Sequence, residues 1–353
     1  MDKFQFYANL AFLLTKTGNW GLIKSLGLEQ QLVKFAFAQI RRRALGLSAR
    51  AVNFQTRGFR GASPHVQQRL ENAGGTFVAG YHLALESNSL EELVSKLAAV
   101  ELELRGFAFE GAAMGLALFD FLTPWRRDRI NKFLRGAGDD HAYMVHVGVG
   151  WVWARAPFGF RGAQKKLDPL LGWLAFDGWG FHEGFFHWPK YIAGQPAPKK
   201  LSGYERRAFD QGLGRSFWFV NGGNIELIAQ TISNFSADRQ RDLWSGIGLA
   251  VTYAGIVNEA SLGELCEKAG NFQPQLAQGA AFAAKARQRA GNLTDYTRLA
   301  TKVLCGLSAE HAARITDEAL ENLPADVAEP AYEVWRRRIQ NQFAANLPAQ
   351  ATK

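Results

Sequence analysis

The chain has 353 residues, of which 47% are hydrophobic, so it can bury one large core or two ordinary ones, and intrinsic disorder is excluded for its body. Its formal net charge of +9 suggests a nucleic-acid partner, but no RNA- or DNA-binding motif accompanies the basic residues, and that class is excluded as well. Two cysteines are too few for a disulfide framework, which indicates a reducing, cytoplasmic setting.

Residues 1–54 are expected to form N-terminal amphipathic helices outside the main body. Their first apolar run lacks the small-residue cleavage site of a signal peptide. Along the chain, apolar residues recur at helical spacing over Leu28–Leu47, Ser87–Leu104, Leu262–Lys268 and Ala331–Phe343. Helix-start signals support this pattern, since Ser89 precedes acidic first-turn residues and Pro330 stands at the head of the last helix.

These patterns predict an all-α, or mainly α, fold. The longest apolar stretch, 107–122, is interrupted by two acidic residues and is too short for a spanning helix, so no transmembrane segment is expected. Alternating valines over Tyr143–Trp153 favour a strand, so minor β content stays open. The proline- and lysine-rich segment 189–204 is predicted to be an exposed linker loop.

A glycine-containing unit recurs along the chain. Gly80 lies 30 residues before Glu110-Gly111, Gly150 lies 33 before Glu183-Gly184, and Gly248 lies 30 before Gln278-Gly279. Glycine within a helix costs about 1 kcal/mol and needs a reason, such as the close approach of two backbones. Repeated helix pairs in a curved or closed array are therefore predicted. The linker at 189–204 would separate a first repeat-containing half, 55–188, from a second, 205–323, followed by a C-terminal helix and tail, 324–353.

Glu110 is the residue whose charge fits its neighbours in the sequence least well. It lies in a segment that is apolar on nearly every face, so its carboxylate must be paired, hydrogen-bonded or shifted in pKa. Arg105 is five residues away and does not share its helix face. A structural carboxylate that accepts hydrogen bonds from another segment is one interpretation, and a general acid or base is the other.

A second polar cluster contains His182, Glu183 and His187. The two histidines are five residues apart, so on one uninterrupted helix they diverge by about 140° and are poorly placed to hold one ion together. Glu183 and His187 share a face, as do His82 and Glu86, and these four residues are weak candidates for a metal site. Neither pair has the spacing of a di-iron or zinc signature, so ordinary hydrogen bonding is the alternative.

Basic residues gather in three short clusters, which are Arg41–Arg43, Arg126, Arg127 and Arg129, and Arg336–Arg338. Solvated helix faces are the simplest interpretation. Contact with an anionic membrane surface or an acidic partner is the alternative. The ten tryptophans and 26 phenylalanines indicate either a large core or an aromatic-lined pocket.

Six segments together resemble a known family. They are RGFAFEGAAMGLALFD (105–120), HVGVGWVWAR (146–155), DPLLGWLAFDGWGFHEGFFHW (168–188), GLGRSFWFV (212–220), DLWSGIGLAVTYAG (242–255) and QGAAFAAKAR (278–287). The family is a domain of unknown function encoded beside the polyketide synthase genes of enediyne antibiotic clusters. The resemblance covers roughly residues 55 to 320 and implies a cytoplasmic accessory protein that processes a linear polyene or its enediyne product. It supplies no catalytic residues.

Three functions are compatible with these observations. The first is an enzyme of secondary metabolism that acts by acid/base chemistry on a long apolar substrate, with polyketide-pathway proteins as partners. The second is a non-catalytic protein that sequesters such a product, and the third is a membrane-peripheral scaffold. The candidate catalytic residues are Glu110, Glu183, His146, His182 and His187, and the candidate substrate-binding residues are Arg105, Trp151, Trp153, Trp179, Arg215 and Trp218. Reaction, cofactor and oligomeric state are unknown from sequence.

Overall fold

The computed structural model describes residues 28–123, 125, 128–156, 158–255, 258–324 and 329–346, so the first half of the expected N-terminal helices lies outside the described residues. The described residues form helices and turns without any strand, which confirms the all-α prediction. The strand left open at residues 143–153 does not form, because these residues lie inside α9 (Ala142–Arg155). This helix is buried on all sides, so its valines alternate without any amphipathic face to reveal the helical period.

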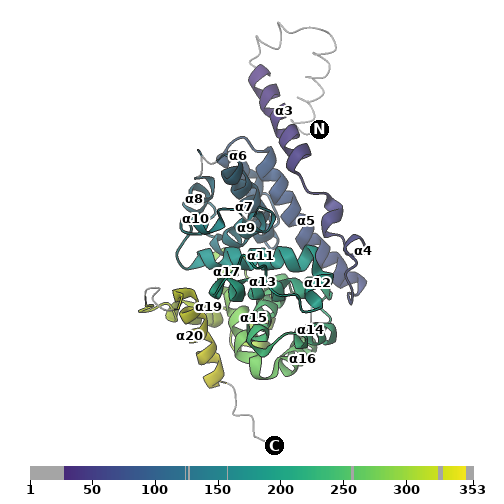
Figure 1. The fold of residues 1–353 in the computed structure, drawn as a ribbon, viewed down its shortest axis with the longest axis vertical. Helices are drawn as coiled ribbons and strands as arrows, with labels where there is room; N and C mark the ends of the chain where they lie inside the picture. The colour runs from purple at the N-terminus through teal and green to yellow at the C-terminus, as the bar shows by residue number, and fades with distance from the viewer. Residues whose placement is uncertain are drawn as a thin grey trace, which may run out of the picture.

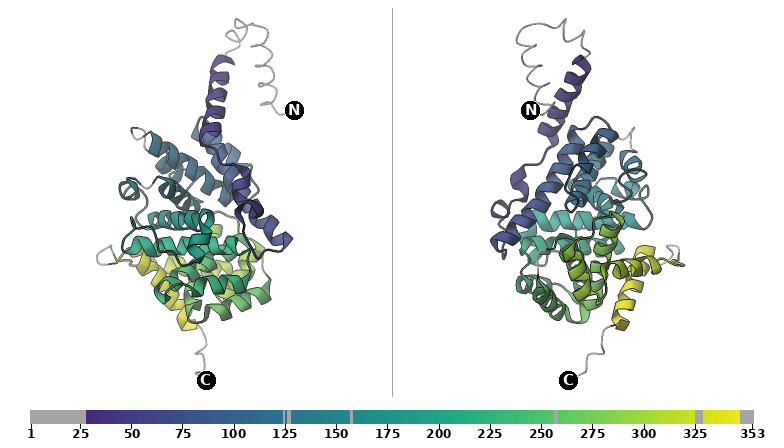
Figure 2. Two further views of the ribbon diagram at one scale, coloured as in Figure 1. Left: turned by 45° about the vertical axis from the view of Figure 1, so that its right-hand side comes forward. Right: turned by 180° about the vertical axis from the view of Figure 1, so that it is seen from behind.

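Core helices follow one another side by side in chain order (Figures 1 and 2). They are α5 (Pro64–Glu86), α7 (Arg105–Leu122), α9, α11 (Leu174–Phe186), α13 (Tyr204–Val220), α15 (Ala237–Ala254), α17 (Gln273–Arg289) and α19 (Ala309–Glu318). Shorter helices connect them, namely α6 (Leu90–Ala98), α8 (Arg129–Leu134), α10 (Phe160–Gln164), η3 (Leu171–Trp173), α12 (Trp188–Ile192), α14 (Ile225–Ser233), α16 (Glu259–Ala269), η4 (Gly270–Phe272) and α18 (Asp295–Leu304). The result is an array of helix pairs.

Both ends of the described chain carry a further helix. At the N-terminal end, α3 (Leu28–Leu45) extends away from the body, and η1 (Ala49–Val52) and α4 (Phe54–Arg57) then run along α5 (Figure 1). At the opposite end, α20 (Ala331–Asn346) packs against α17. No described helix combines the length and the apolar character that crossing a membrane requires.

Local signals account for several of the helix starts. Ser63, Ser89, Asn224 and Ser308 each accept a hydrogen bond from a first-turn backbone N–H of the helix that follows them. The single helix predicted over 87–104 is instead α6, a break at residues 99–104, and then α7, which is bounded by no such cap. Arg105 stabilises this break, because its guanidinium donates to the carbonyls of Ala98 (2.8 Å) and Val100 (3.2 Å).

Glycines set the separation of the core helices. A β-carbon added at Gly178 of α11 would come within 3.0 Å of the carbonyl oxygen of Val147, and one added at Gly150 of α9 would approach that of Ala175 as closely. The same reciprocal arrangement joins α5 to α7, α11 to α13, α13 to α15 and α15 to α17. Each of these pairs therefore packs backbone against backbone, with Cα–H groups directed at carbonyl oxygens.

The contacts also correct the repeat register. Asp177-Gly178, and not Glu183-Gly184, occupies the position that Glu110-Gly111 and Gln278-Gly279 hold in their own helices. Gly212 and Gly246 occupy it in α13 and α15, so the sequence Gly212-Leu-Gly214 is a further copy of the unit.

The array curves until its beginning meets its later helices. The backbone N–H of Arg60 donates to the carbonyl of Val220 (3.0 Å), and Arg287 of α17 donates to that of Glu103 (3.2 Å). Phe107 at the start of α7 packs edge-on against Tyr253 of α15. On either side of residues 189–204, α11 and α13 pack directly against each other, and Leu201 within that segment is buried. The division into two halves stays a prediction.

Candidate functional site

One repeat position places polar side chains in the middle of the helical array. It is the residue immediately before the glycine that faces the preceding helix, and in five core helices it is Glu110, Asp177, Gln211, Ser245 or Gln278. All five side chains are buried. In α9 the equivalent residue is Val147. We call these five residues the polar line.

Hydrogen bonds join most of the polar line. Gln211 Nε2 donates to Asp177 Oδ2 (2.8 Å), and Ser245 Oγ donates to Gln278 Oε1 (2.9 Å). Arg215, one turn after Gln211 on α13, forms a buried ion pair with Asp177. Buried polar groups are tolerated only when they are satisfied in this way.

Glu110 is the first residue of the polar line in chain order. It is 3% exposed and accepts a hydrogen bond from Trp151 Nε1 of α9 (2.9 Å). Burial raises the pKa of Glu110 to about 7, against the opposing effects of the Arg215 charge and the Trp151 hydrogen bond; the negative charge of Asp177 adds to the rise. A carboxyl group with this pKa exists in both protonation states at neutral pH.

Glu110 and Arg215 face a cavity of about 30 Å³. Its other lining side chains are almost all apolar, and they are Val52, Ala73, Phe77, Phe107, Trp151, Phe181, Phe185 and Phe219. This volume holds about one water molecule. The Arg215 guanidinium also lies over the Phe181 ring, 5.0 Å from its centroid. Burial lowers the pKa of Arg215, but the charges of Asp177 and Glu110 more than offset this and raise it, so Arg215 stays protonated.

Tyr253 is a third polar residue near this end of the polar line. Its hydroxyl is buried and makes no hydrogen bond with the described residues. Burial raises the pKa of Tyr253, the charge of Arg287 opposes the rise, and the nearby Glu110 charge adds to it. The hydroxyl points at Gly106 of α7, where a β-carbon would collide with it. Tyr253 is therefore a buried polar group, close enough to feel the charge of Glu110, whose hydroxyl is not satisfied by the described residues.

The other predicted substrate-binding residues lie elsewhere. Arg105 stabilises the break before α7. Trp153 and Trp179 pack in an aromatic cluster with Phe160 and Phe176, and Trp218 is fully buried beside Gly223. Only Trp151 and Arg215 of that predicted set meet Glu110.

Of the predicted catalytic histidines, His146 lies apart from Glu110's cavity. It is buried in α9, and its Nδ1 lies 2.7 Å from the carbonyl of Ala142. Burial lowers the pKa of His146. Only Nδ1 is satisfied, because Nε2 is buried and makes no hydrogen bond with the described residues.

His182, Glu183 and His187 lie together, so the divergence expected for one uninterrupted helix is wrong. α11 ends at Phe186, and His187 leaves the helix with φ −121° and ψ 26°, which brings its imidazole back toward Glu183. Burial raises the pKa of Glu183, but the two adjacent imidazoles more than offset this and lower it. The edge of the His182 ring packs against Trp151, 5.6 Å between centroids, so this group adjoins the Glu110 site.

His82 and Glu86 do not share a site with each other. The imidazole of His82 accepts a hydrogen bond from the backbone N–H of Leu47 (3.2 Å), whereas Glu86 pairs with Arg42. His82 is therefore bound by Leu47 and Glu86 by Arg42, so the two side chains have different partners.

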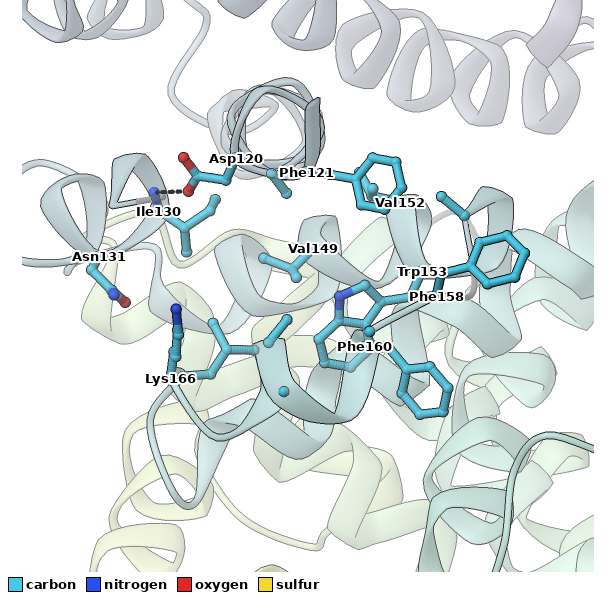
Figure 3. A pocket seen from close by; sticks show the side chains of 16 residues that line it. Asp120, Phe121, Ile130, Asn131, Val149, Val152, Trp153, Phe158, Phe160 and Lys166 are labelled. Atoms are coloured by element: carbon cyan, nitrogen blue, oxygen red, sulfur yellow. Dashed lines mark hydrogen bonds between the residues drawn. The ribbon is translucent and has the colours of Figure 1, made fainter. Parts of the chain in front are cut away.

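A second hollow of about 120 Å³ lies on the other side of α9 (Figure 3). Val149, Val152, Trp153 and Phe160 form its apolar floor, and Asp120 and Lys166 lie at its edge. Two of its lining residues, Phe121 and Phe158, are exposed, and Phe158 is 72% exposed. An apolar hollow with exposed aromatic side chains around it is typical of a binding site for an apolar group.

Sequence reasoning missed Asp177, Gln211 and Tyr253 as members of the Glu110 site. The signal for the first two was present, because both precede a glycine of the repeated unit, as Glu110 does. Tyr253 carries no such mark, since it reaches the site only through the curvature of the array.

Comparison with known proteins gives one family. The family described as protein of unknown function, DUF1702, matches residues 36–343. No curated protein and no solved structure shows a significant match.

Proposed function

Since this chain belongs to the DUF1702 family, whose description assigns no activity, we propose a function from the site itself: the protein is an enzyme that moves a proton on an apolar, conjugated substrate, with Glu110 as the acid/base group. The resemblance to accessory proteins of enediyne clusters suggests the substrate class, which is a linear polyene or enediyne-type polyketide intermediate of bacterial secondary metabolism. Such an enzyme would work beside other proteins of a polyketide pathway.

One observation carries this proposal. A fully buried carboxyl group with a pKa of about 7 faces an aromatic-lined cavity beside a buried, charged guanidinium. Perturbed carboxyl groups in apolar clefts are frequent acid/base residues, because a pKa near the working pH serves proton abstraction and proton return equally well. The aromatic walls would accept the hydrocarbon part of the substrate.

The proposed step is an isomerisation without net oxidation or reduction. Glu110 carboxylate takes a proton from a carbon next to a conjugated carbonyl, and the electron pair of the broken C–H bond delocalises onto the carbonyl oxygen. The Arg215 guanidinium stabilises this negative charge. Glu110 then returns its proton to another carbon of the conjugated system, which moves the double bond and restores the enzyme.

A substrate can reach Glu110 only if η1, which contributes Val52 to the cavity wall, moves. Val52 of η1 lines the cavity and packs against Gly74 of α5, where an added β-carbon would come within 3.0 Å of it. The cavity of about 30 Å³ holds a water molecule and not a polyene. A substrate would therefore displace η1, which packs against α5 of the body and against α4, the next helix along the chain.

The test is Glu110→Gln, which is nearly isosteric. We expect the variant to fold and product formation in a producing host to fall by about 100-fold or more, because the amide cannot carry a proton. Asp210→Asn is the matched control: this buried carboxyl group, with a pKa raised to about 6 by burial, pairs with Arg239 and lies outside the cavity. Equal yields from Glu110→Gln and the parent protein would overturn the proposal.

A second candidate function rests on the hollow in Figure 3. An apolar group bound there, between exposed Phe121 and Phe158, would be shielded by a protein that performs no reaction. Substitution of Val152 by Trp would fill this hollow and leave Glu110 untouched. Loss of product tolerance in the host without loss of product formation would favour this sequestering function.

A third candidate is a membrane-peripheral scaffold, and α3 carries the observation that favours it. Val33, Phe37 and Ile40 are each more than half exposed and follow one another at helical spacing. Arg42 and Arg43 lie in the last turn of the same helix. Sedimentation with anionic lipid vesicles, lost on replacement of Phe37 and Ile40 by Ser, would favour this function.

A further inference from the structure

The C-terminal end of α11 carries a compact group of metal-binding side chains. His182, Glu183 and His187 each offer one ligand atom, and these three atoms lie within 4.8 Å of one another. His182 Nδ1 is 3.4 Å from Glu183 Oε1, and His187 Nδ1 is 3.1 Å from Glu183 Oε2. Ligands of a tetrahedral zinc ion at about 2.0–2.1 Å stand about 3.3 Å apart. The two His–Glu distances are close to this value, although each goes to a different oxygen of Glu183, and the full set would have to draw together from its 4.8 Å span to close on an ion.

The local sequence explains why the group forms. On a regular helix, the side chain of His182 would point away from those of Glu183 and His187. Here the backbone N–H of His187 still donates to the carbonyl of Glu183 (2.8 Å), but His187 itself is non-helical and precedes the separate short helix α12. Because α11 ends at Phe186, His182 within the helix and His187 beyond its end can both turn toward Glu183.

His182 supplies an independent sign of a ligand. Its side chain is buried, and Nδ1 makes no hydrogen bond with any described residue, although Glu183 is 3.4 Å away. The ring is held in place by Trp151 and by Phe186, whose ring centroid lies 4.9 Å away. A buried imidazole nitrogen that is fixed beside a carboxylate and makes no well-formed hydrogen bond is poorly satisfied, and a ligand would satisfy it.

We propose that His182, Glu183 and His187 bind a divalent transition-metal ion of the zinc class. Two imidazoles and one carboxylate make a three-ligand set that leaves a coordination position open. His187 is about half exposed, so the ion and a solvent ligand can reach the site from outside. The Tyr191 hydroxyl, 3.4 Å from Glu183 Oε2, donates to the carboxylate and orients it.

A nearby arginine limits the affinity of the site. The charge of Arg155 acts on His182, and Arg57 lies over the Phe186 ring, 4.9 Å from its centroid. Because the charge of Arg155 repels a cation at this site, Arg155→Gln is expected to tighten metal binding by several-fold, whereas Arg57 is engaged by the carbonyl of Phe186.

The experiment is a titration of the full chain with Co²⁺, followed by its visible absorption, and competition with Zn²⁺. We expect one saturable ion per chain with the intense bands of a four- or five-coordinate site. His187→Ala, which removes an exposed ligand, and His182→Ala should each weaken binding at least about 100-fold, since even residues that only orient ligands contribute 10–100-fold. His82→Ala is the matched control, because His82 belongs to the other His/Glu pair at helical spacing and is engaged elsewhere.

The outcomes separate this inference from the proposed function. Glu110→Gln should bind Co²⁺ as the parent does, since Glu110 lies outside the ligand set. Absence of saturable Co²⁺ binding would overturn the inference, and so would equal binding by the parent, His182→Ala and His187→Ala. Circular dichroism of each variant without metal shows that a loss of binding is not a loss of fold.

Discussion

Glu110 and Glu333 are equally buried carboxylates near opposite ends of the polar line, yet their surroundings differ. Glu333 of α20 accepts from Tyr204 (2.7 Å), pairs with Arg207 (2.8 Å) and lies 3.4 Å from Arg336. Glu110 has one hydrogen bond, from Trp151, and otherwise faces a cavity. Burial alone therefore does not distinguish a structural carboxylate from a reactive one; the number of charged partners in contact does.

Arg336 contacts the end of the polar line that is opposite Glu110. It is fully buried, pairs with Asp242 (2.9 Å) and donates to Gln278 (3.2 Å). This overturns the expectation that Arg336–Arg338 form a solvated basic face, because the first of the three points into the core. Its neighbour Arg337 does lie near the surface, where it pairs with Glu329.

The largest expected effect is therefore that of Arg336→Met. Loss of the guanidinium leaves Asp242 and Glu333 short of charge compensation, and we expect the free energy of unfolding to fall by about 3–5 kcal/mol. Arg337→Met is the matched control, and its half-exposed pair should contribute less than about 1 kcal/mol. Urea denaturation of both variants measures the difference. Equal losses would mean that the buried ion pairs of Arg336 contribute no more to stability than the half-exposed pair of Arg337.

The next effect concerns pH and Glu110. Its pKa is about 7 in the folded protein, against an ordinary value of 4.5, so between these values the folded chain holds a proton that the unfolded chain has released. Rising pH therefore favours unfolding, and the carboxyl group should cost up to about 3 kcal/mol of stability above pH 7. Glu110→Gln removes this dependence. The variant should gain stability relative to the parent as pH rises from 5 to 8 in denaturation experiments; a constant difference would contradict the raised pKa.

A smaller effect tests the close packing that aligns the polar line. Gly80→Ala on α5 would place a β-carbon within 3.0 Å of the Ala108 carbonyl, and we expect a loss of about 1–3 kcal/mol as α5 and α7 separate. Gly75→Ala on the same helix meets no atom within 4 Å, and should raise stability by about 0.5–1 kcal/mol. Thermal unfolding of the two variants should shift in opposite directions. Shifts of the same sign would count against backbone-to-backbone packing.

Much of this fold could be predicted from the sequence. Helical spacing and the scarcity of alternation gave the all-α class, and the recurring glycines predicted paired helices, because an interior glycine costs stability unless a neighbouring backbone needs its space. The strand expected at 143–153 failed for a physical reason: a helix buried on every side shows no periodicity. The register of the middle repeat could not be read either, since a match of glycines does not show which carbonyl each one faces.

The candidate site was harder to predict. Burial of Glu110 followed from its apolar neighbours along the chain, whereas its neighbours in space come from other helices. Trp151 comes from the adjacent helix α9, and the curvature of the array brings α15 close to α7. The approach of His182 and His187 depends on the end of α11 at Phe186, and helix ends are poorly marked where no cap residue is present. Long-range geometry, and not residue type, decides these contacts.

The central claim is that Glu110 is held as a carboxyl group that exchanges its proton near neutral pH. The direct measurement is a pH titration by infrared difference spectroscopy, in which the spectrum of Glu110→Gln is subtracted from that of the parent to isolate one carboxyl band. The account predicts that this band reaches half its intensity near pH 7. A midpoint at the ordinary glutamate value, near 4.5, would contradict it.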